Sequence, residues 1–321
     1  ENYLRKSLDC IINQSLKDIE IICINDGSTD NSLKILEEYA QKDNRIIVID
    51  KENGGVATAR HAGMKVAKGD YIAFVDPDDW VDTRMYEEMY SISKEKDLDI
   101  SICASYSCRE KNGVIQKSKG HYSLKGVPKK YFNKVFSNED VIDDIFKFPA
   151  TCWCKLHKRE FLEKNNIYFQ DIRVGEDQLF FFQSFIYAKR IYIINKFLYY
   201  YRKNRKDSAM TRKNVPNLSA IQIFYGIEKM LIESGLINKY KIVFINKYLD
   251  KAISWIGKVD SYHKEEYYKE FSKLISHIKT NYSDPDKSKN WWDYFDCSMN
   301  DNYFWLKLKI YLAKIKCSYG L

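Results

Sequence analysis

The sequence predicts an α/β fold, with a mainly parallel sheet flanked by helices and a helical region at the C-terminal end. Two observations lead to this prediction. Over the first hundred residues, short and almost wholly apolar runs alternate with segments in which apolar residues recur at helical spacing. From residue 216 onward, the spacing is helical throughout. Strands that alternate with helices form right-handed βαβ units, and hence a doubly wound parallel sheet.

Each element of the first part follows from its local residues. Strands that are buried on both faces are apolar throughout, and four runs have this character: residues 19–24, 45–50, 71–75 and 99–104. Apolar spacing places helices at residues 3–12, 33–39 and 56–67, and from residue 83 onward. Asp26, Asn53 and Asp76 follow the first three strands. Because ligands bind at the carboxyl ends of parallel strands, we expect these three side chains to meet in one crevice.

The later residues predict a division into two domains. A helix is expected around residues 139–146, and apolar runs follow at 179–186 and 191–201. Further helices are expected at residues 218–233, 240–255, 265–280 and 303–316. A basic, polar link near residues 206–215 separates an α/β domain, residues 1–206, from a helical region, residues 207–321. Residues 1–199 carry 30 basic and 31 acidic side chains and residues 200–321 carry 22 and 13, so the excess positive charge belongs to the helical region.

Composition and cysteine spacing exclude several classes of protein. Of the 321 residues, 45% are hydrophobic and 30% are charged, which is typical of a folded globular protein. The eight cysteines are too few for a disulfide scaffold and contain no Cys-x-x-Cys pair, so a zinc knuckle is not expected either. We expect reduced cysteines in a cytoplasmic protein. No run approaches the roughly 20 apolar residues of a membrane span.

Three carboxylates, Asp76, Asp78 and Asp79, crowd the end of the third strand. Like charges at such close range repel one another, and a divalent cation such as Mg²⁺ or Mn²⁺ holding a diphosphate would relieve the repulsion with hard oxygen ligands. A solvated turn in which Asp78 or Asp79 caps the next helix fits the same residues. Residue type alone leaves both interpretations open.

Asp26 and a glycine pair follow the first two strands. Asp26 lies in a turn with Gly27, where its carboxylate can accept a hydrogen bond from a base N–H or a ribose hydroxyl; turn chemistry is the alternative. Gly54 and Gly55 would let the backbone approach a ligand, with the guanidinium of Arg60 nearby, and a packing role for the glycines is equally open.

Glu176 and Asp177 precede an apolar helix. Adjacent residues on a helix point about 100° apart, so at most one of the two carboxylates faces a given site. A carboxylate near a helix N-terminus is kept ionised and can act as a general base. Acidic residues are also common at helix starts simply because they stabilise the helix dipole.

Together, these motifs resemble those of glycosyltransferase family 2, a large family of inverting enzymes. Four motifs occur in order within roughly residues 1–205: INDGSTDNS at 24–32, NGG at 53–55 with Arg60, FVDPDDW at 74–80, and GED at 175–177. The segments at 153–161 and 199–202, with Ser208, are similar to the branch of the family that builds bacterial surface polysaccharides. The resemblance implies the Rossmann-like GT-A fold and a nucleoside-diphosphate sugar donor, expected to be a UDP-sugar.

Carried over residue by residue, the resemblance implies how the donor is bound. Asp26 would contact the uracil or the ribose, and Asn53 and Arg60 would lie beside the nucleotide. Asp76 and Asp78 would hold Mg²⁺ or Mn²⁺ together with the diphosphate, with Asp78 as the direct ligand.

The resemblance also implies the catalytic step. Asp177 would take the proton from the acceptor hydroxyl as that hydroxyl attacks the anomeric carbon and inverts it. Arg202, Arg205 or Lys206 would close over the diphosphate. The acceptor would be a glycan or a lipid-linked glycan.

The sequence departs from the family pattern at three places. The opening strand of the family would precede Glu1, so we expect the chain to begin partway into the domain and to gain stability and donor affinity when it is extended upstream. Asn25 stands where the family commonly has Asp, and it can still form hydrogen bonds. His61 stands where Asn is common, and we expect a structural role for it.

The basic C-terminal region supports two interpretations. Aromatic residues and lysines are interleaved over residues 303–316, which suits a helix lying on an anionic membrane surface at the inner face of the cytoplasmic membrane. A helix packed on the catalytic domain with a solvated lysine face fits equally well. A nucleic-acid partner is not expected, because no DNA- or RNA-binding motif is present.

Two other functions fit parts of the pattern. A sugar nucleotidyltransferase also pairs a parallel sheet with acidic metal ligands, but the Gly-rich phosphate loop that it needs is absent from the sequence. A non-catalytic sugar-nucleotide or glycan-binding scaffold has no need of Asp177 in addition to Asp26, Asp76 and Asp78. The predicted function is therefore metal-dependent, inverting sugar transfer to a hydroxyl of a growing bacterial surface glycan.

Overall fold

The computed structural model describes residues 1–111, 114–120, 122–172, 175–203, 218–256, 259 and 262–282. Contacts within the chain divide it into two compact units, Glu1–Thr211 (unit 1) and Arg212–Leu321 (unit 2). In the described residues, unit 1 is α/β and unit 2 is helical.

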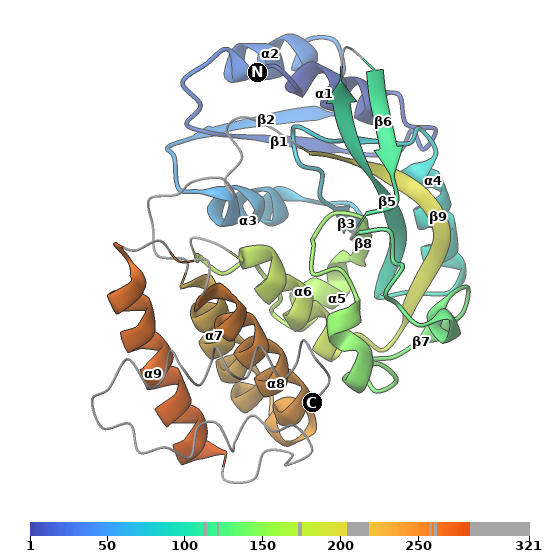
Figure 1. The fold of residues 1–321 in the computed structure, drawn as a ribbon. Coiled ribbons are helices and arrows are strands. Elements are labelled where there is room, and N and C mark those ends of the chain that lie inside the picture. Colours follow the sequence, from blue (N-terminus) through green and yellow to red (C-terminus); the bar gives the residue numbers. More distant parts are fainter. Residues whose placement is uncertain are drawn as a thin grey trace. The chain divides into compact units, whose positions relative to one another are not determined.

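Unit 1 alternates helices and strands over its first hundred residues, as the sequence predicts (Figure 1). The strands are β1 (Ile21–Asp26), β2 (Ile46–Lys51), β3 (Tyr71–Ala73), β4 (Trp80–Val81), β5 (Ile100–Lys111), β6 (Val114–Ser118), β7 (Val135–Phe136), β8 (Lys155–Lys158) and β9 (Ile191–Arg202). The helices are α1 (Leu4–Ile12), α2 (Ser32–Ala40), α3 (Val56–Val66), α4 (Met85–Glu95), α5 (Arg159–Lys164) and α6 (Glu176–Tyr187), with 3₁₀ helices η1 (Lys129–Tyr131) and η2 (Ile142–Lys147). The helix expected at 139–146 is thus a 3₁₀ turn.

Strands β1 and β2 form a parallel two-stranded sheet, in which Ile21 lies opposite Ile46. Helices α1 and α2 lie on one side of this sheet and α3 on the other (Figure 1). On the α3 side, Gly63 lies against Ile22 and Ile24. The other side has a core of buried residues: Leu8, Ile21, Ile35, Leu36, Tyr39 and Ile46. Helices on both sides explain why these strands are largely apolar, although Ile47 of β2 is 41% exposed.

The larger sheet has seven strands, in the order β3-β8-β5-β9-β4, with β6 beside β5 and β7 beside β9. The fold class is confirmed, but the expectation of a mainly parallel sheet is wrong. Only β5 and β9 are parallel in this sheet, whereas the other five pairs are antiparallel. In the described residues, β1 and β2 also pair with each other and not with β3. A parallel neighbour needs a crossover connection, whereas β6 begins three residues after β5 ends and runs back antiparallel to it.

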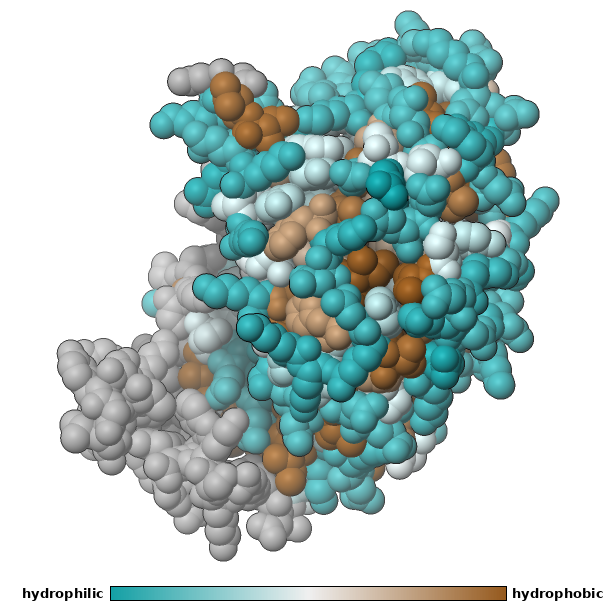
Figure 2. All heavy atoms as spheres, turned by 90° about the vertical axis from the view of Figure 1, so that its right-hand side faces the viewer, coloured by the Kyte–Doolittle hydropathy of each residue, from teal (hydrophilic) through white to brown (hydrophobic). Residues whose placement is uncertain are grey.

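Hydrophobic residues are not gathered into one large surface patch on the side of the molecule shown in Figure 2, where they lie in small groups among hydrophilic residues. None of the helices in the described part of the chain has both the length and the apolar character needed to cross a bilayer.

Unit 2 contains α7 (Ser219–Glu233), α8 (Ile237–Ile256) and α9 (Lys264–Asn281), close to three of the predicted helices. Its core is rich in fully buried aromatic side chains: Phe224, Tyr240, Phe244, Tyr267 and Phe271. The helix predicted at 303–316 lies outside the described residues, so its role stays a prediction.

A buried carboxylate joins α7 to the end of α9. Glu228 is 6% exposed, and its Oε1 accepts a hydrogen bond from the Tyr282 hydroxyl. The same oxygen lies 2.7 Å from Nε2 of His277. A buried carboxylate that loses a partner keeps the cost of its desolvation, so this contact stabilises unit 2.

We expect His277→Ala to lower the stability of unit 2 by about 1–3 kcal/mol, because it removes a partner of the buried Glu228 carboxylate. Thermal melting of the full chain, followed by circular dichroism, measures the change. Lys273→Ala is the matched control, since Lys273 lies on the same helix, with 59% of its side chain exposed, and pairs with Glu270 on the surface. If both variants melt alike, the contact with Glu228 contributes nothing.

Candidate active site

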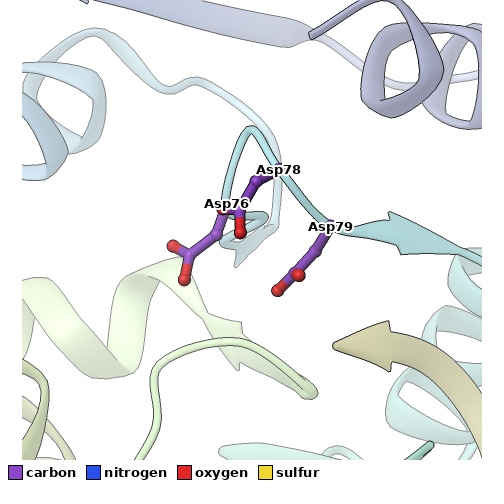
Figure 3. A group of neighbouring side chains, drawn as sticks. All are labelled: Asp76, Asp78 and Asp79. Carbon is purple, nitrogen blue, oxygen red and sulfur yellow. The ribbon is translucent and has the colours of Figure 1, made fainter. Parts of the chain in front are cut away.

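The loop between β3 and β4 brings three carboxylates together. Atoms of Asp76, Asp78 and Asp79 that could bind a metal lie within 4.8 Å of one another. Figure 3 shows the three side chains leaving the loop on the same side. Asp78 and Asp79 are buried, whereas Asp76 is partly exposed. This arrangement suits a divalent cation, because hard oxygen ligands that crowd together repel one another until a cation lies between them.

Asp79 is tied to β9 through both of its oxygens. Its Oδ2 accepts a hydrogen bond from the Tyr199 hydroxyl at 2.9 Å, and its Oδ1 accepts one from the Arg202 backbone N–H at 2.7 Å. Burial raises the pKa of Asp79 to about 8, with further contributions from Asp78 and Asp76. Asp79 therefore fixes the loop to the sheet, which favours Asp76 and Asp78 as the residues that could hold a cation.

Arg60 of α3 connects this loop to the start of α6. Its Nη2 donates to Asp76 Oδ1 at 2.8 Å, and its Nη1 donates to Glu176 Oε1 at 2.9 Å. Burial opposes the positive charge, but these two carboxylates help to raise the pKa of Arg60 above its ordinary value. Arg60 thus joins segments that are far apart in the sequence, and we call Asp76, Arg60 and Glu176 the Arg60 clamp.

Asp177 stands beside the clamp, in the first turn of α6. Burial, together with the charges of Glu176 and Asp76, raises the pKa of Asp177 to about 7, while Arg60 opposes this shift. A carboxylate with a pKa near neutrality can accept a proton at physiological pH and release it again. The structure therefore places the predicted base close to the acidic loop, in electrostatic range of Asp76.

We expect Glu176→Gln to shift the acid limb of the pH profile of kcat/KM to lower pH. The Glu176 charge raises the pKa of Asp177, so its removal lets Asp177 ionise at a lower pH, and a base works only when it is ionised. Wild-type activity should rise with pH up to an apparent pKa at or below about 7. Rates of UDP release across pH measure both profiles, and an acid limb that stays in place would show that Asp177 is not the titrating group.

Asp26 holds the turn between β2 and α3. Its Oδ1 accepts hydrogen bonds from Lys51 Nζ at 2.6 Å and Gly54 N at 3.0 Å, and its Oδ2 accepts one from Gly55 N at 2.8 Å. Burial opposes ionisation, but these donors lower the pKa of Asp26. The Asn53 side chain donates to the Asp26 carbonyl at 2.7 Å. The structure thus brings Asp26 and Asn53 together. Both carboxylate oxygens of Asp26 already accept hydrogen bonds within the protein.

Gly27 permits this close approach. Its φ is +68°, and a Cβ there would lie 2.8 Å from the backbone nitrogen of Asn53. Both the backbone conformation and the space require glycine at this position.

Arg202, at the end of β9, lies under the acidic loop. Its Nε donates to the Asp78 carbonyl at 2.9 Å and its Nη1 to Glu110 at 3.0 Å, and its guanidinium lies 5.0 Å from the ring centroid of Trp80. With only 8% of its side chain exposed, Arg202 supports the loop here. Arg205 and Lys206 lie outside the described residues, so their contact with a diphosphate stays a prediction.

Asn25 and His61 have the structural surroundings that the sequence suggested. The amide of Asn25 donates to Asp50 at 2.6 Å, and Asn25 is buried. His61 is stacked edge-on against Tyr168, and burial lowers its pKa.

Two residues lie in electrostatic range of Asp177 and had no predicted role, although Lys155 belongs to the family-like segment at 153–161. Lys155 is 1% exposed, and its Nζ donates to the backbone carbonyls of Pro149 and Thr151 at 2.9 and 2.6 Å. Burial lowers its pKa to about 8. The ring of Tyr122 lies 4.6 Å from that of Trp153, and burial, with Tyr201, Asp177 and Asp76, raises its pKa to about 12. Local spacing indicates no contact with Asp177 for either residue, because that contact is made across the fold.

Comparison with known proteins identifies the fold and the family. The family model described as "Glycosyl transferase family 2" matches residues 1–165. The chain belongs to this family. Three of the four motifs recognised in the sequence, at 24–32, 53–55 and 74–80, lie within the matched residues, whereas the fourth, at 175–177, follows them.

Similar curated proteins are named as bacterial glycosyltransferases. The chain is 34% identical over 209 residues to glycosyltransferase GlyA of Streptococcus pneumoniae, covering 63% of this chain and 29% of that protein. It is 32% identical over 292 residues to the poly(ribitol-phosphate) beta-glucosyltransferase of Bacillus spizizenii, covering 86% and 43%. The chain thus spans less than half the length of either relative.

A solved structure shares the fold. Staphylococcus aureus TarS 1–349 in complex with UDP-GlcNAc superposes with a TM-score of 0.65 over 86% of this chain and 77% of that one, at 22% identity. At this identity the likeness concerns the fold alone, and it agrees with the GT-A fold that the family resemblance implies.

Proposed function

We propose that this family 2 chain transfers a sugar from a nucleoside-diphosphate sugar, expected to be a UDP-sugar, to a hydroxyl group with inversion of the anomeric carbon. The observation that carries the proposal is the Arg60 clamp, since it joins the acidic loop at Asp76 to the helix start that bears Asp177. A donor-binding group and a general base are thereby held in one place, although 100 residues separate them in the sequence. We also propose that residues 1–206 form the catalytic domain.

The acidic loop would bind the donor diphosphate. Asp76 and Asp78 would hold Mg²⁺ or Mn²⁺. The cluster fits such an ion by its oxygen ligands and by the mutual repulsion of its carboxylates, which adds to burial in raising the pKa of Asp79. When bound, the cation would stabilise the negative charge that the diphosphate gains as it leaves. Asp79 keeps its bonds to β9 and holds the loop in position.

Asp177 would act on the acceptor. Its carboxylate accepts the proton of the attacking hydroxyl as the oxygen bonds to the anomeric carbon, and the bond to the diphosphate breaks on the opposite side. Proton removal and bond cleavage in one displacement give inversion. Arg60 and Glu176 position this carboxylate relative to Asp76.

The nucleotide would lie at the carboxyl ends of β1 and β2. Asp26 and Asn53 form the turn there, and Arg60 lies one turn into α3. Asp26 would meet the base or ribose through its remaining acceptor capacity, and Arg202 and Arg205 would border the diphosphate.

The acceptor would be a growing glycan of the bacterial surface, free or linked to lipid. The names of the relatives support this class, because they include transferases that act on poly(ribitol-phosphate). Sugar transfer to such an acceptor would take place at the inner face of the cytoplasmic membrane. The basic C-terminal region would meet the anionic surface there.

A donor panel tests the proposal. The chain is incubated with UDP-sugars, with Mn²⁺ or Mg²⁺, and UDP release is measured with and without EDTA. We expect release from at least one UDP-sugar, abolished by EDTA, and thermal stabilisation by that donor beyond that by UDP. Release of pyrophosphate from a sugar phosphate and UTP would instead identify a nucleotidyltransferase, and binding without release would identify a scaffold.

A further inference from the structure

Four aromatic rings form a row across one face of the larger sheet. The ring of Trp80 stacks on Tyr200 at 5.6 Å, Tyr200 on Tyr106 at 5.9 Å, and Tyr106 on Phe197 at 4.4 Å. We call these four residues the aromatic row. Trp80 pairs with Tyr200 and Tyr200 with Tyr106 in the strand register, so the row crosses β4, β9 and β5.

The aromatic row lies on the opposite face of the sheet from the side chains of the proposed active site. Successive side chains of a strand point to opposite faces, and Tyr199, whose hydroxyl bonds Asp79, precedes Tyr200 of the row. One residue joins the two faces. Arg202 lies over Trp80 at the end of the row and bonds the backbone of Asp78 in the acidic loop.

Three lysines border the row. The ammonium group of Lys6 lies 3.8 Å from the ring centroid of Trp80, that of Lys117 lies 4.4 Å from Tyr200, and that of Lys119 lies 5.2 Å from Phe197. All three residues are exposed. None of these three lysines forms a salt bridge with another described residue, whereas Arg202 in the same region pairs with Glu110. Partial burial of the Lys6 ammonium group and then the charge of Arg202 lower the pKa of Lys6, while Glu110 opposes the shift.

We propose that the three lysines, whose ammonium groups lie over the aromatic row, bind an anionic polymer that carries a phosphate or carboxylate group in each repeat. This proposal rests on the proposed function and narrows its acceptor, a growing bacterial surface glycan, to one that carries negative charges. Adjacent strands are about 4.8 Å apart, so positions from β6 to β4 extend over roughly 14 Å, which is enough for charges on successive repeats. Rings stacked across three strands give a rigid base, and the ammonium groups supply the charge that a polyanion requires.

A membrane fits this surface less well than a polymer. Side chains that enter a bilayer project their apolar parts into it. The four rings of the row are only partly exposed and stack on one another, and none of them is among the strongly exposed large hydrophobic residues of the described chain. The charges, and not the rings, are therefore what the surface offers to a partner.

The test removes the charges and keeps the rings. The full chain carrying Lys6→Gln, Lys117→Gln and Lys119→Gln is compared with wild type and with a control that carries Lys34→Gln, Lys68→Gln and Lys129→Gln. The control lysines are exposed, lie elsewhere on unit 1 and lose the same total charge. Binding of fluorescent long-chain inorganic polyphosphate is measured at low and at physiological salt, and thermal melting checks that all three proteins fold.

We expect the first variant to lose about tenfold or more in polyphosphate affinity and to show a weaker salt dependence, while the control changes by less than about twofold. Equal losses in both variants would overturn the proposal, because net charge alone would then explain the binding. Binding to phosphatidylglycerol vesicles that depends on the same three lysines, without polyphosphate binding, would overturn it in favour of a membrane. Because polyphosphate binding needs no sugar donor, its outcome is independent of the UDP-release assay that tests the proposed function.

Discussion

Asp177→Asn lowers sugar transfer by about 10³-fold if Asp177 is the general base, within the range that such catalysis contributes. Asparagine has nearly the same size as aspartate but cannot accept the proton of the acceptor hydroxyl. Initial rates of UDP release in the presence of acceptor, at several pH values, measure the effect. The acid limb near pH 7 should disappear together with the activity, because the group that titrates there is gone.

Asp140→Asn is a suitable control for this change. Asp140 is an exposed carboxylate of the same unit, which accepts hydrogen bonds from Ser137 and lies in another loop. Its replacement should leave the rate within about twofold, as is usual for surface positions. If Asp177→Asn turns over as fast as the parent protein, the assignment of the base is wrong.

Asp78→Ala has the second large expected effect, a loss of metal-dependent UDP binding of at least about tenfold. Calorimetric titration of UDP with and without Mn²⁺ measures it, because the metal should increase affinity in the wild type and no longer do so in the variant. Alanine also removes repulsion from Asp79, so the variant should fold at least as well as the parent.

Asp82→Ala supplies the matched control for the loop. Asp82 lies just after β4, and its Oδ1 accepts a hydrogen bond from the Arg84 backbone outside the acidic cluster. It should retain the Mn²⁺ effect on UDP affinity. Equal loss in both variants would mean that the loop was disturbed as a whole, and a retained Mn²⁺ effect in Asp78→Ala would exclude Asp78 as a ligand.

Local pattern was sufficient to predict the βαβ part of the fold. Strands β1 and β2 are largely apolar because helices pack on both sides of them, and this apolar character shows in a run of a few residues. The acidic loop after β3 and the start of α6 at Glu176 were also visible, since each is a motif within a few residues.

Long-range pairing was beyond the sequence pattern. Nothing near Arg60 indicates that its guanidinium reaches Glu176, 116 residues away, in addition to Asp76. The antiparallel strands β4 and β8 are short, so their few residues do not specify a partner or a direction. The same holds for Arg202, whose donors are used by the Asp78 carbonyl and by Glu110.

The first anomer released from a donor tests the proposed displacement most directly. In the absence of acceptor, water takes the place of the acceptor hydroxyl, and ¹H NMR follows the free sugar released from an α-linked UDP-sugar before it mutarotates. Direct displacement assisted by Asp177 predicts that the β anomer appears first. An initial α anomer would contradict it.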